Sequence, residues 1–364
     1  MPFTKKYIIF LLVFLPLCFF SQAKKHKLTK EEKKQIAEAK KTKKLEQKKI
    51  NKEKRDKRRY LRKHPENIEE YKKVFMFKPR YSYPAVTLNV TSRKKDGEKF
   101  NWKSYTPGIV GLAIKIKKVY ISGGVEIPQS SALIKKYGDT KQRDIFIGIN
   151  GRIVLWSMFY RDYKGFYLSD YNQFYPNWNK DSTYFPKSPN LHIREAGINL
   201  GFNFNRNFSV NGAFSQSERQ KKSAGSFMMN FSERYQHIQT DTINIVPPSQ
   251  SDNYPNLNKL MSGDFVTTII SFGAGYQIVM GKFHFTPIVL LGSGVQFQNY
   301  QQIGANKFWV NVPTYASAKA QLGYNGDYFF TNVIYNLEFN SIPIKESRMR
   351  FFYNAIEFNM GFRF

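Results

Sequence analysis

The last ten residues of the chain, AIEFNMGFRF (residues 355–364), alternate strictly between large apolar side chains and small or polar ones. The apolar set is Ile356, Phe358, Met360, Phe362 and Phe364. This alternation is typical of a β-strand that has one apolar face and one polar face. Chain ends usually fray and carry polar residues, so the pattern predicts a strand that is held in a sheet up to its final residue.

The composition supports a large β protein whose two faces differ. Aromatic residues make up 16% of the 364 residues, and 57 basic residues stand against 27 acidic ones. The first 23 residues, MPFTKKYIIFLLVFLPLCFFSQA, read as a secretory signal peptide, because two lysines precede an apolar run too short to span a bilayer. The only cysteine, Cys18, lies in this segment, so disulfides and thiolate metal sites are excluded from the mature chain. No later segment is apolar enough for a membrane helix, so a membrane form must be a closed barrel.

Residues 24–73 form a separate zone with 22 basic and 9 acidic residues and only sparse apolar ones. We interpret this zone as a solvated helical or disordered leader in the periplasm. The alternative is an electrostatic contact with an acidic polymer, a membrane surface or a partner protein. Nucleic acid is not expected as a partner, because a secreted chain would not meet it.

Long alternating runs fill residues 74–364, and the connections between them alternate in length. Tight turns are expected at 117–118, 205–206, 281–282 and 325–326, and longer polar stretches at 93–104, 129–142, 169–190, 247–262, 300–308 and 342–348. Short turns on one side and long loops on the other are typical of an antiparallel transmembrane β-barrel of the outer membrane. Thirteen runs are visible, but such a barrel needs an even number. Twelve strands are favoured, with fourteen as the alternative if residues 224–246 hold a hairpin.

In such a barrel the final stretch would be the closing strand, paired with the first strand so that no edge stays open. Its apolar residues would face lipid, and Glu357, Asn359 and Arg363 would face the lumen. The residues Phe358, Met360, Phe362 and Phe364 fit the C-terminal aromatic signal that the outer-membrane assembly machinery recognises. That machinery is therefore an expected partner.

Two internal stretches, FYRDYKGFYL (159–168) and FSQSERQKKSAGSF (214–227), carry a family resemblance. The chain resembles the Bacteroidetes proteins grouped as the domain-of-unknown-function family 4421, over most of residues 75–364. The residues that carry the resemblance are Gly165, Phe166, Tyr167, Gln220, Ser223, Ala224, Gly225 and Ser226. The resemblance implies an outer-membrane β-barrel and no established activity. Gly225 is expected either to adopt a positive φ in a tight loop or to make room for a neighbouring side chain.

The search for catalytic chemistry gives no catalytic residue, no metal site and no cofactor. Past the leader the histidines are His192, His237 and His284, and only a pairing of Ser188 with His192 resembles the start of a hydrolase site. No nucleophile-elbow, zinc-protease or phosphate-loop motif occurs. A barrel enzyme that acts on lipid or lipopolysaccharide therefore remains an alternative rather than the main expectation.

Basic clusters are the remaining candidate sites. The clusters Arg219, Lys221, Lys222 and Arg93, Lys94, Lys95 are expected in outer loops, together with Lys135, Lys136, Lys141, Arg143, Lys345, Arg348 and Arg350. Lipopolysaccharide phosphates lie on that side of the membrane and suit such cations, although general solubility is an equal explanation. The sequence thus predicts an outer-membrane barrel with a structural or binding role or a narrow passive pore. The alternatives are the barrel enzyme and a scaffold that works through the basic leader.

Overall fold

The computed structural model describes residues 29–63, 67–71, 75–116, 118–175, 178, 184–240, 245–258, 260–302 and 304–364. The expected signal peptide with Cys18 lies outside these residues. The chain divides into two units, residues 1–63 and 64–364. In the first unit, α1 (Lys30–Lys63) is one helix that carries 17 basic and 6 acidic residues. None of the helices among the described residues is long and apolar enough to cross a membrane.

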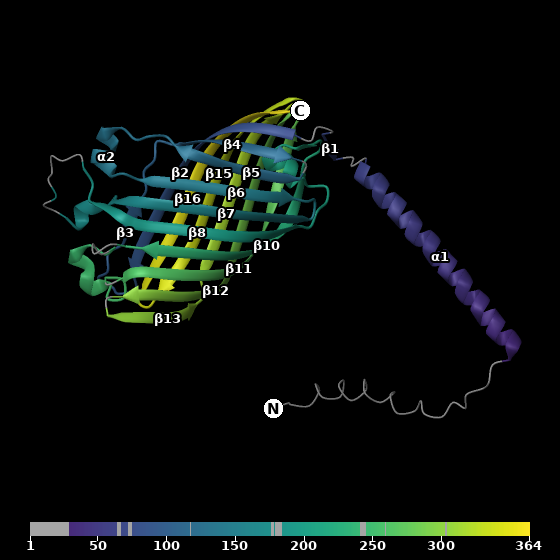
Figure 1. The fold of residues 1–364 in the computed structure, drawn as a ribbon, viewed down its shortest axis with the longest axis horizontal. Coiled ribbons are helices and arrows are strands. Elements are labelled where there is room, and N and C mark those ends of the chain that lie inside the picture. The colour runs from purple at the N-terminus through teal and green to yellow at the C-terminus, as the bar shows by residue number, and fades with distance from the viewer. Residues whose placement is uncertain are drawn as a thin grey trace, which may run out of the picture. The chain divides into compact units, whose positions relative to one another are not determined.

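The second unit is a closed antiparallel barrel of twelve strands, as the twelve-strand interpretation predicted (Figure 1). The strands in the wall are β2 (Phe75–Ser92), β4 (Ile109–Ile116), β5 (Val119–Glu126), β6 (Lys141–Asn150), β7 (Val154–Leu168), β8 (Lys187–Asn203), β10 (Ala224–Gln239), β11 (Leu260–Met280), β12 (Phe283–Gln302), β14 (Thr314–Asn325), β15 (Phe329–Ile344) and β16 (Ser347–Arg363). Each strand pairs with the next, and β16 pairs with β2 to close the ring.

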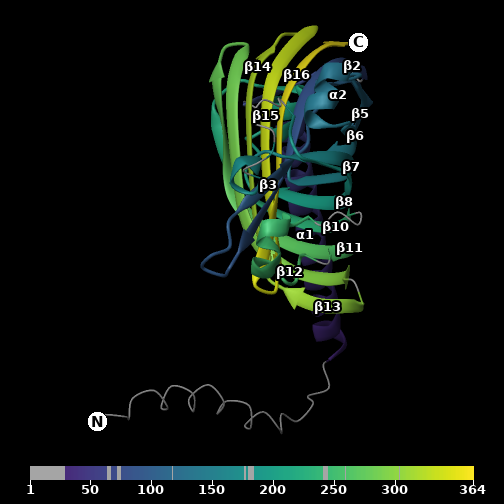
Figure 2. The same ribbon diagram turned by 90° about the vertical axis from the view of Figure 1, so that its left-hand side faces the viewer.

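The closing strand has the orientation that its alternation predicts. Figure 2 shows β16 beside β2, and the ladder between them reaches the last residue, where the amide of Phe364 donates to the carbonyl of Phe75 at 3.0 Å. The apolar residues of the stretch are exposed on the outside of the barrel, whereas Asn359 and Arg363 are buried inside it. The wall therefore has no open edge at the joint between its first and last strands.

The two ends of the barrel differ in their connections. The end that holds the start of β2 and the end of β16, here the turn end, has the tight turns β4–β5, β11–β12 and β14–β15. The opposite loop end carries five additional elements (Figure 1). They are β3 (Phe100–Lys103), α2 (Ser131–Tyr137), η1 (Tyr171–Gln173), η3 (Pro248–Asn253) and β13 (Ala305–Asn311). The expected long loop at 342–348 is wrong, because β15 and β16 extend to a tight turn at residues 345–346.

The hairpin expected about residues 205–206 is also wrong, and this error explains the thirteenth run. Residues 204–223 leave the wall between β8 and β10 and fold into the lumen; we call them the plug. The plug contains the π-helix η2 (Asn211–Ser215) and β9 (Glu218–Gln220), which pairs with β1 (Ile68–Glu70). Phe208 and Gln216 of the plug are fully buried. Phe208, Val210 and Phe214 stand at alternate positions, but the residues between Val210 and Phe214 are small or polar, which suits an irregular segment rather than a strand.

Apolar side chains fill the lumen in its loop-end half. They come from inward faces of β2, β7, β8, β10, β11, β12, β15 and β16, and from β3 and the loops. Trp102 of β3 is part of this core and its indole donates to the carbonyl of Ile245 at 2.7 Å. Other members with almost no exposure are Val86, Leu88, Val90, Phe100, Leu168, Leu191, Ile193, Ile238, Leu257, Phe265, Ile342, Ile344 and Met349. This half of the barrel is therefore a packed core rather than a channel.

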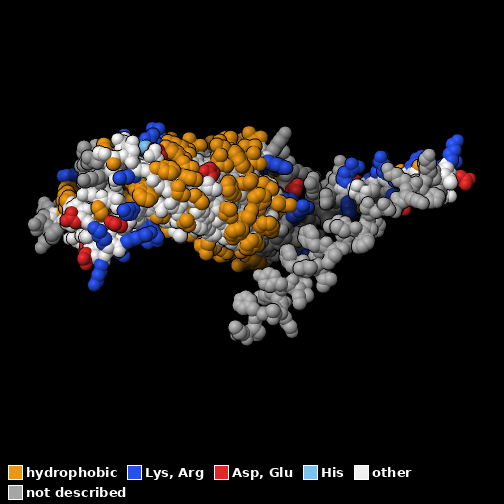
Figure 3. Space-filling model, turned by 90° about the horizontal axis from the view of Figure 1, so that it is seen from below, with side chains coloured by type: hydrophobic (Ala, Val, Ile, Leu, Met, Phe, Trp, Pro, Cys, Tyr) orange, Lys and Arg blue, Asp and Glu red, His pale blue; other side chains and the backbone are white. Residues whose placement is uncertain are grey.

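The outside of the barrel carries the opposite pattern. Figure 3 shows a broad belt of hydrophobic side chains on one face, with Lys and Arg side chains gathered beyond the loop-end edge of the belt. Exposed aromatic and aliphatic residues such as Phe231, Phe272, Leu291 and Ile356 belong to the outward faces of the strands. A closed barrel with an apolar belt is the architecture that crosses an outer membrane.

Gly165 provides a test of the family residues in the wall. It has φ +86° at the bulge between Lys164 and Phe166, and a Cβ there would lie 2.2 Å from the carbonyl oxygen of Asp139. We expect Gly165→Ala to lower the free energy of unfolding by roughly 1–3 kcal/mol because of backbone strain and this clash. The measurement is the urea midpoint of the barrel in lipid vesicles. Gly123→Ala is the matched control, since a Cβ there meets no atom within 4 Å. Equal midpoints for both variants would contradict the requirement for glycine at the bulge.

Candidate functional site

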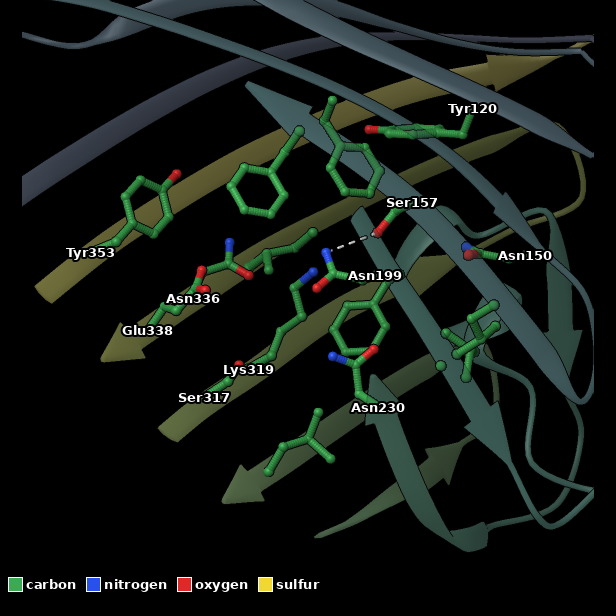
Figure 4. A pocket seen from close by; sticks show the side chains of 18 of the residues that line it. Tyr120, Asn150, Ser157, Asn199, Asn230, Ser317, Lys319, Asn336, Glu338 and Tyr353 are labelled. Atoms are coloured by element: carbon green, nitrogen blue, oxygen red, sulfur yellow. Dashed lines mark hydrogen bonds between the residues drawn. The ribbon is translucent and has the colours of Figure 1, made fainter. Parts of the chain in front are cut away.

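A cavity of about 340 Å³, which we call the chamber, lies inside the barrel. Phe214 and Ser215 of the plug line one part of it, and Tyr353, a member of the apolar core, lines another. Figure 4 shows side chains of two walls facing each other across the chamber, with Lys319 and Glu338 on one wall and Asn199 on the other. The chamber is lined by charged and amide side chains together with apolar ones, whereas the core that fills the loop-end half is apolar.

Two arginines and two glutamates beside the chamber form a closed set of ion pairs, which we call the ion ring. Arg161 on β7 lies 3.2 Å from a carboxylate oxygen of Glu195 on β8 and 3.0 Å from one of Glu338 on β15. Arg234 on β10 lies 3.0 Å from the second oxygen of Glu195 and also pairs with Glu338. Since β15 is separated from β7 and β10 by several strands in either direction around the ring, the ion ring braces opposite walls.

Aromatic rings support the arginines of the ion ring. The guanidinium of Arg161 lies 4.1 Å from the ring centroid of Tyr353 and 4.5 Å from that of Phe159. Arg234 lies 4.9 Å from the centroid of Tyr315 and donates to its hydroxyl at 3.3 Å. These contacts keep the buried guanidinium groups in van der Waals and cation–π contact as well as in ion pairs.

Two lysines reach the chamber without an acidic partner among the described residues. Lys78 of β2 is 3% exposed, and its recorded contact is with the ring of Tyr120, 5.0 Å from its amine. Lys319 of β14 contacts the ring of Phe214 at 4.6 Å. A third lysine, Lys115 of β4, donates instead to the plug at 3.0 Å, to the side chain of Asn211.

The plug is fixed at the turn end by the last strand and the last turn of the barrel. Arg363 donates its Nε–H to the carbonyl of Gln216 at 2.9 Å, and Asn332 donates to the Gln216 side chain at 2.8 Å. Arg219 pairs with Asp327 in the β14–β15 turn. The hydrogen bond from Arg219 holds the pKa of the Asp327 carboxyl below its usual range.

The cluster Arg219, Lys221 and Lys222 is therefore not at the loop end, and the expectation that it lies on the same side as the other basic clusters is wrong. The three residues lie at the turn end, because Arg219 contacts Asn325 and Asp327 at the β14–β15 turn. The sequence pattern failed here because a segment folded into the lumen has the composition of a surface loop. Arg93, Lys94 and Lys95 do lie at the loop end and are exposed, and Lys94 donates to the carbonyl of Asp252 at 2.8 Å.

The family residues of the second stretch anchor the plug. Gln220 donates to the carbonyls of Asn207 and Lys222 at 2.7 and 2.9 Å, and Ser223 accepts from the amide of Val279 at 2.9 Å. Ser226 accepts from the amide of Asn205 at 2.9 Å. A Cβ on Gly225, which follows Ala224, would lie 2.5 Å from the ring of Tyr276. Gly225 thus makes room for a neighbouring side chain, and its φ is not positive.

A second group of cations lies on the outside of the barrel near the loop end, on β6, β7 and β8. The strand register places the outward residues in four rows, which run from the loop end toward the belt: Lys141, Lys164 and His192; Arg143, Asp162 and Arg194; Ile145, Tyr160 and Ala196; Ile147, Met158 and Ile198. We call Lys141, Arg143, Lys164 and Arg194 the basic band. Of these, Lys141 pairs with Asp139 at 3.8 Å, and the other three have no ion pair among the described residues.

The histidines do not assemble a hydrolase site in the described part of the chain. His192 lies 2.5 Å from Asp162 rather than beside Ser188, which is buried. His237 lies 2.8 Å from Asp264, and no Ser or Cys contacts either imidazole in the recorded hydrogen bonds. The same residues show no group of three or more His, Cys, Asp or Glu side chains suited to a metal ion.

Sequence reasoning missed the chamber and its ion ring. Arg161, Glu195, Arg234 and Glu338 are far apart in the chain, and each is one polar residue in an alternating strand. Their inward direction follows from the alternation, but their meeting depends on the register and the width of the closed barrel. The usable signal was the presence of long charged side chains in positions that face the lumen.

The sequence profile of one protein family, described as a domain of unknown function (DUF4421), matches residues 65–364. The chain belongs to this family. The family resemblance noted in the sequence is thus confirmed, and its residues have structural roles in the bulge at Gly165 and in the plug anchor. None of the curated proteins compared with the chain matches it.

Solved structures similar to the chain are outer-membrane proteins. The outer membrane protease OmpT of Escherichia coli has 7% sequence identity and a TM-score of 0.36, with 80% of this chain and 97% of that chain covered. The toluene transporter TodX of P. putida has 8% identity and a TM-score of 0.27, with 80% and 90% covered. The chain itself is a closed antiparallel β-barrel with an apolar belt; at these identities and TM-scores the neighbours carry no argument about its activity.

The ion ring predicts a large cost for removing one of its members. We expect Arg234→Met to lower the free energy of unfolding by about 3–5 kcal/mol, because two buried carboxylates, Glu195 and Glu338, each lose one of their two arginine partners. The double variant Arg234→Met with Glu195→Gln is expected to recover part of this loss. The measurement is the urea midpoint in lipid vesicles, with Lys282→Met in an exposed pair as the control, where about 0–1 kcal/mol is expected. A loss in Arg234→Met no larger than in the control would contradict the buried ring.

The Arg219–Asp327 pair predicts a pH dependence of the plug. Because the pKa of Asp327 is lower in the folded chain than in the unfolded one, the pair stabilises the plug above the unfolded value, about 4, and this contribution is lost as the pH falls through the folded value. We expect hydrogen exchange of residues 204–223, corrected for intrinsic rates, to increase over this range in the wild type. Asp327→Asn should show no such change, whereas Asp252→Asn in the η3 element should behave as the wild type.

Proposed function

We propose that the protein is a non-conducting barrel of the outer membrane that binds lipopolysaccharide through its basic band. In this proposal the turn end and the leader are periplasmic and the loop end faces outward, as in barrels with short periplasmic turns. The observation that carries the proposal is the change from cation rows to apolar rows on three neighbouring strands.

The basic band has the geometry that anionic headgroups require. The row of Ile145, Tyr160 and Ala196 lies next to the cation rows on the side of the apolar belt. Acyl chains would therefore cover this apolar row, while the lipid phosphates meet the cations. Arg143, Lys164 and Arg194 are without ion pairs among the described residues, which favours charge-assisted hydrogen bonds to phosphate. Arg194 also donates to the side chain of Gln239 at 3.4 Å. A band in the wall is also better fixed than the exposed Arg93–Lys95 segment, since its strands are paired on both sides.

The closed lumen favours binding over passage. A pore needs a continuous water-filled path, but the apolar core occupies the loop-end half and the plug occupies the turn end. Trp102 and Phe100 of β3 lie inside the barrel with less than 5% exposure. A passive pore is therefore the less supported of the two expected roles.

A scaffold that works through the basic leader is a second candidate, and one contact favours it. β1, in the last part of the leader, pairs with β9 of the plug, and Glu69 and Glu70 bind Arg219 and Arg152. A partner that binds the leader would thus be tied to the plug through a short segment. Loss of a periplasmic partner on deletion of residues 24–63 would support this role, and full retention would count against it.

Charge removal in the basic band tests the main proposal. The variant Arg143→Gln, Lys164→Gln, Arg194→Gln is expected to bind purified lipopolysaccharide at least about tenfold more weakly, since three charge-assisted contacts are lost. The matched control is Arg206→Gln, Lys221→Gln, Lys222→Gln, which removes the same charge from exposed positions at the turn end. Affinity is measured by fluorescence titration of the barrel in detergent micelles. Equal weakening in both variants would mean that only total charge matters.

Planar-bilayer recording tests the closed lumen separately. We expect no steady conductance from the full chain, because neither end offers an open path. Stable channels in the wild type would contradict a non-conducting role, whatever the lipopolysaccharide affinity.

A further inference from the structure

The chamber holds more hydrogen-bond donors than its own acceptors satisfy. The Nε atoms of Arg80, Arg161 and Arg234 are buried and have no acceptor among the described residues. The amines of Lys78 and Lys319 are likewise without a recorded hydrogen bond or ion pair there. A buried donor without an acceptor costs about 1–3 kcal/mol, and more when it is charged. Three such buried groups and two lysine amines without a recorded acceptor, all at one cavity, indicate a site that an acceptor-rich ligand completes.

The charges around the chamber also favour an anionic ligand. Around the chamber the cations are Lys78, Arg80, Arg161, Arg234 and Lys319, and the carboxylates are Asp144, Glu195, Glu338 and Glu357. The ion ring is balanced within itself, and Arg80 lies 3.8 Å from Glu357. Tyr353 donates to Asp144 at 3.3 Å. Five cations against four carboxylates leave an excess of one positive charge, which is carried by the two lysines.

The shape allows a ligand between the two walls. In Figure 4 Lys319 extends from β14 toward Asn199, and Asn230 and Ser157 lie on the same opposite wall. Asn199 donates to Ser157 at 3.3 Å, so its side chain is held in place. A volume of about 340 Å³ falls in the range of small-molecule sites. The amides and hydroxyls offer hydrogen bonds to a polar body beyond the anionic group.

We propose that the chamber binds a small oxyanion, a phosphate or carboxylate group on a polar molecule, between Lys78 and Lys319. Arg80, Arg161 and Arg234 line the same cavity. Their Nε–H groups lack an acceptor, and the ion ring fixes Arg161 and Arg234 in position. This site lies inside the barrel and is independent of the basic band, which is on the outer surface. The plug covers the turn-end side, so the ligand enters when the barrel folds around it or when the plug moves.

The test uses the full chain with the basic band neutralised by Arg143→Gln, Lys164→Gln and Arg194→Gln, so that outer phosphate binding does not contribute. The protein is refolded into detergent micelles in the presence of inorganic phosphate or glucuronate, which admits the probe whatever the plug does. Equilibrium dialysis with radiolabelled probe then gives the stoichiometry and the affinity. We expect about one bound anion per chain for at least one probe, as one chamber allows.

The deciding comparison adds Lys78→Met and Lys319→Met to this background. These changes remove the two lysine charges with little change in side-chain length, so the barrel is expected to fold, and the affinity should fall at least about tenfold. Lys221→Met with Lys222→Met at the turn end is the control and should bind as the background does. The thermal midpoint of the background protein should also rise in phosphate relative to chloride of equal ionic strength, and not in the double lysine variant.

No bound anion after refolding with either probe would overturn the proposal, and so would equal binding in the two lysine variants. The outcomes for the chamber and the basic band are separable. If the band variant loses lipopolysaccharide binding but still binds an anion in the chamber, both proposals are supported. If the band variant binds lipopolysaccharide as the wild type does, only the proposal for the basic band is contradicted.

Discussion

The hydrogen-bond ladder between β2 and β16 is the constraint on which the rest of the structure depends. In a bilayer every backbone N–H and C=O group must find a partner inside the protein, so a sheet must close. The ladder runs from Ser92 opposite Ser347 to the last residues of the chain. Closure fixes the width of the lumen, and that width decides which inward side chains meet across it, including Arg161 of β7 and Glu338 of β15.

A barrel of this width must then be filled, and the chain does so in two ways. In the loop-end half, β3 and the loops bring Phe100, Trp102 and Leu257 against the inward faces of the strands. At the turn end, the plug is held by Gln216, whose backbone and side chain both bind strand residues. Arg363 links the two constraints, because it ends the closing strand and also holds the plug. The last stretch of the sequence thus closes the wall and the turn end together.

The sequence predicted the barrel, its closing strand and the twelve-strand count because alternation is a local property. The outward Ile356 and the inward Asn359 follow from period two alone. It did not predict the plug, because Phe208, Val210 and Phe214 alternate as in a strand, residues 215–223 have a loop-like composition, and burial inside a barrel depends on what surrounds them. It placed Arg219 at the wrong end for the same reason. The ion ring was beyond local reasoning, since its members lie on four strands and meet only through closure.

The contrast between the two halves of the lumen is itself an argument about function. Buried ion pairs are often no more stabilising than apolar residues of similar volume, and the loop-end half proves that this chain can fill a lumen with apolar side chains. A chamber lined by Lys78, Lys319 and three arginines is therefore not required for filling alone. Buried donors without acceptors are costly, and they occur together with the excess positive charge in the chamber that the plug lines. The middle of the barrel is thus where selection for something other than stability is expected to act.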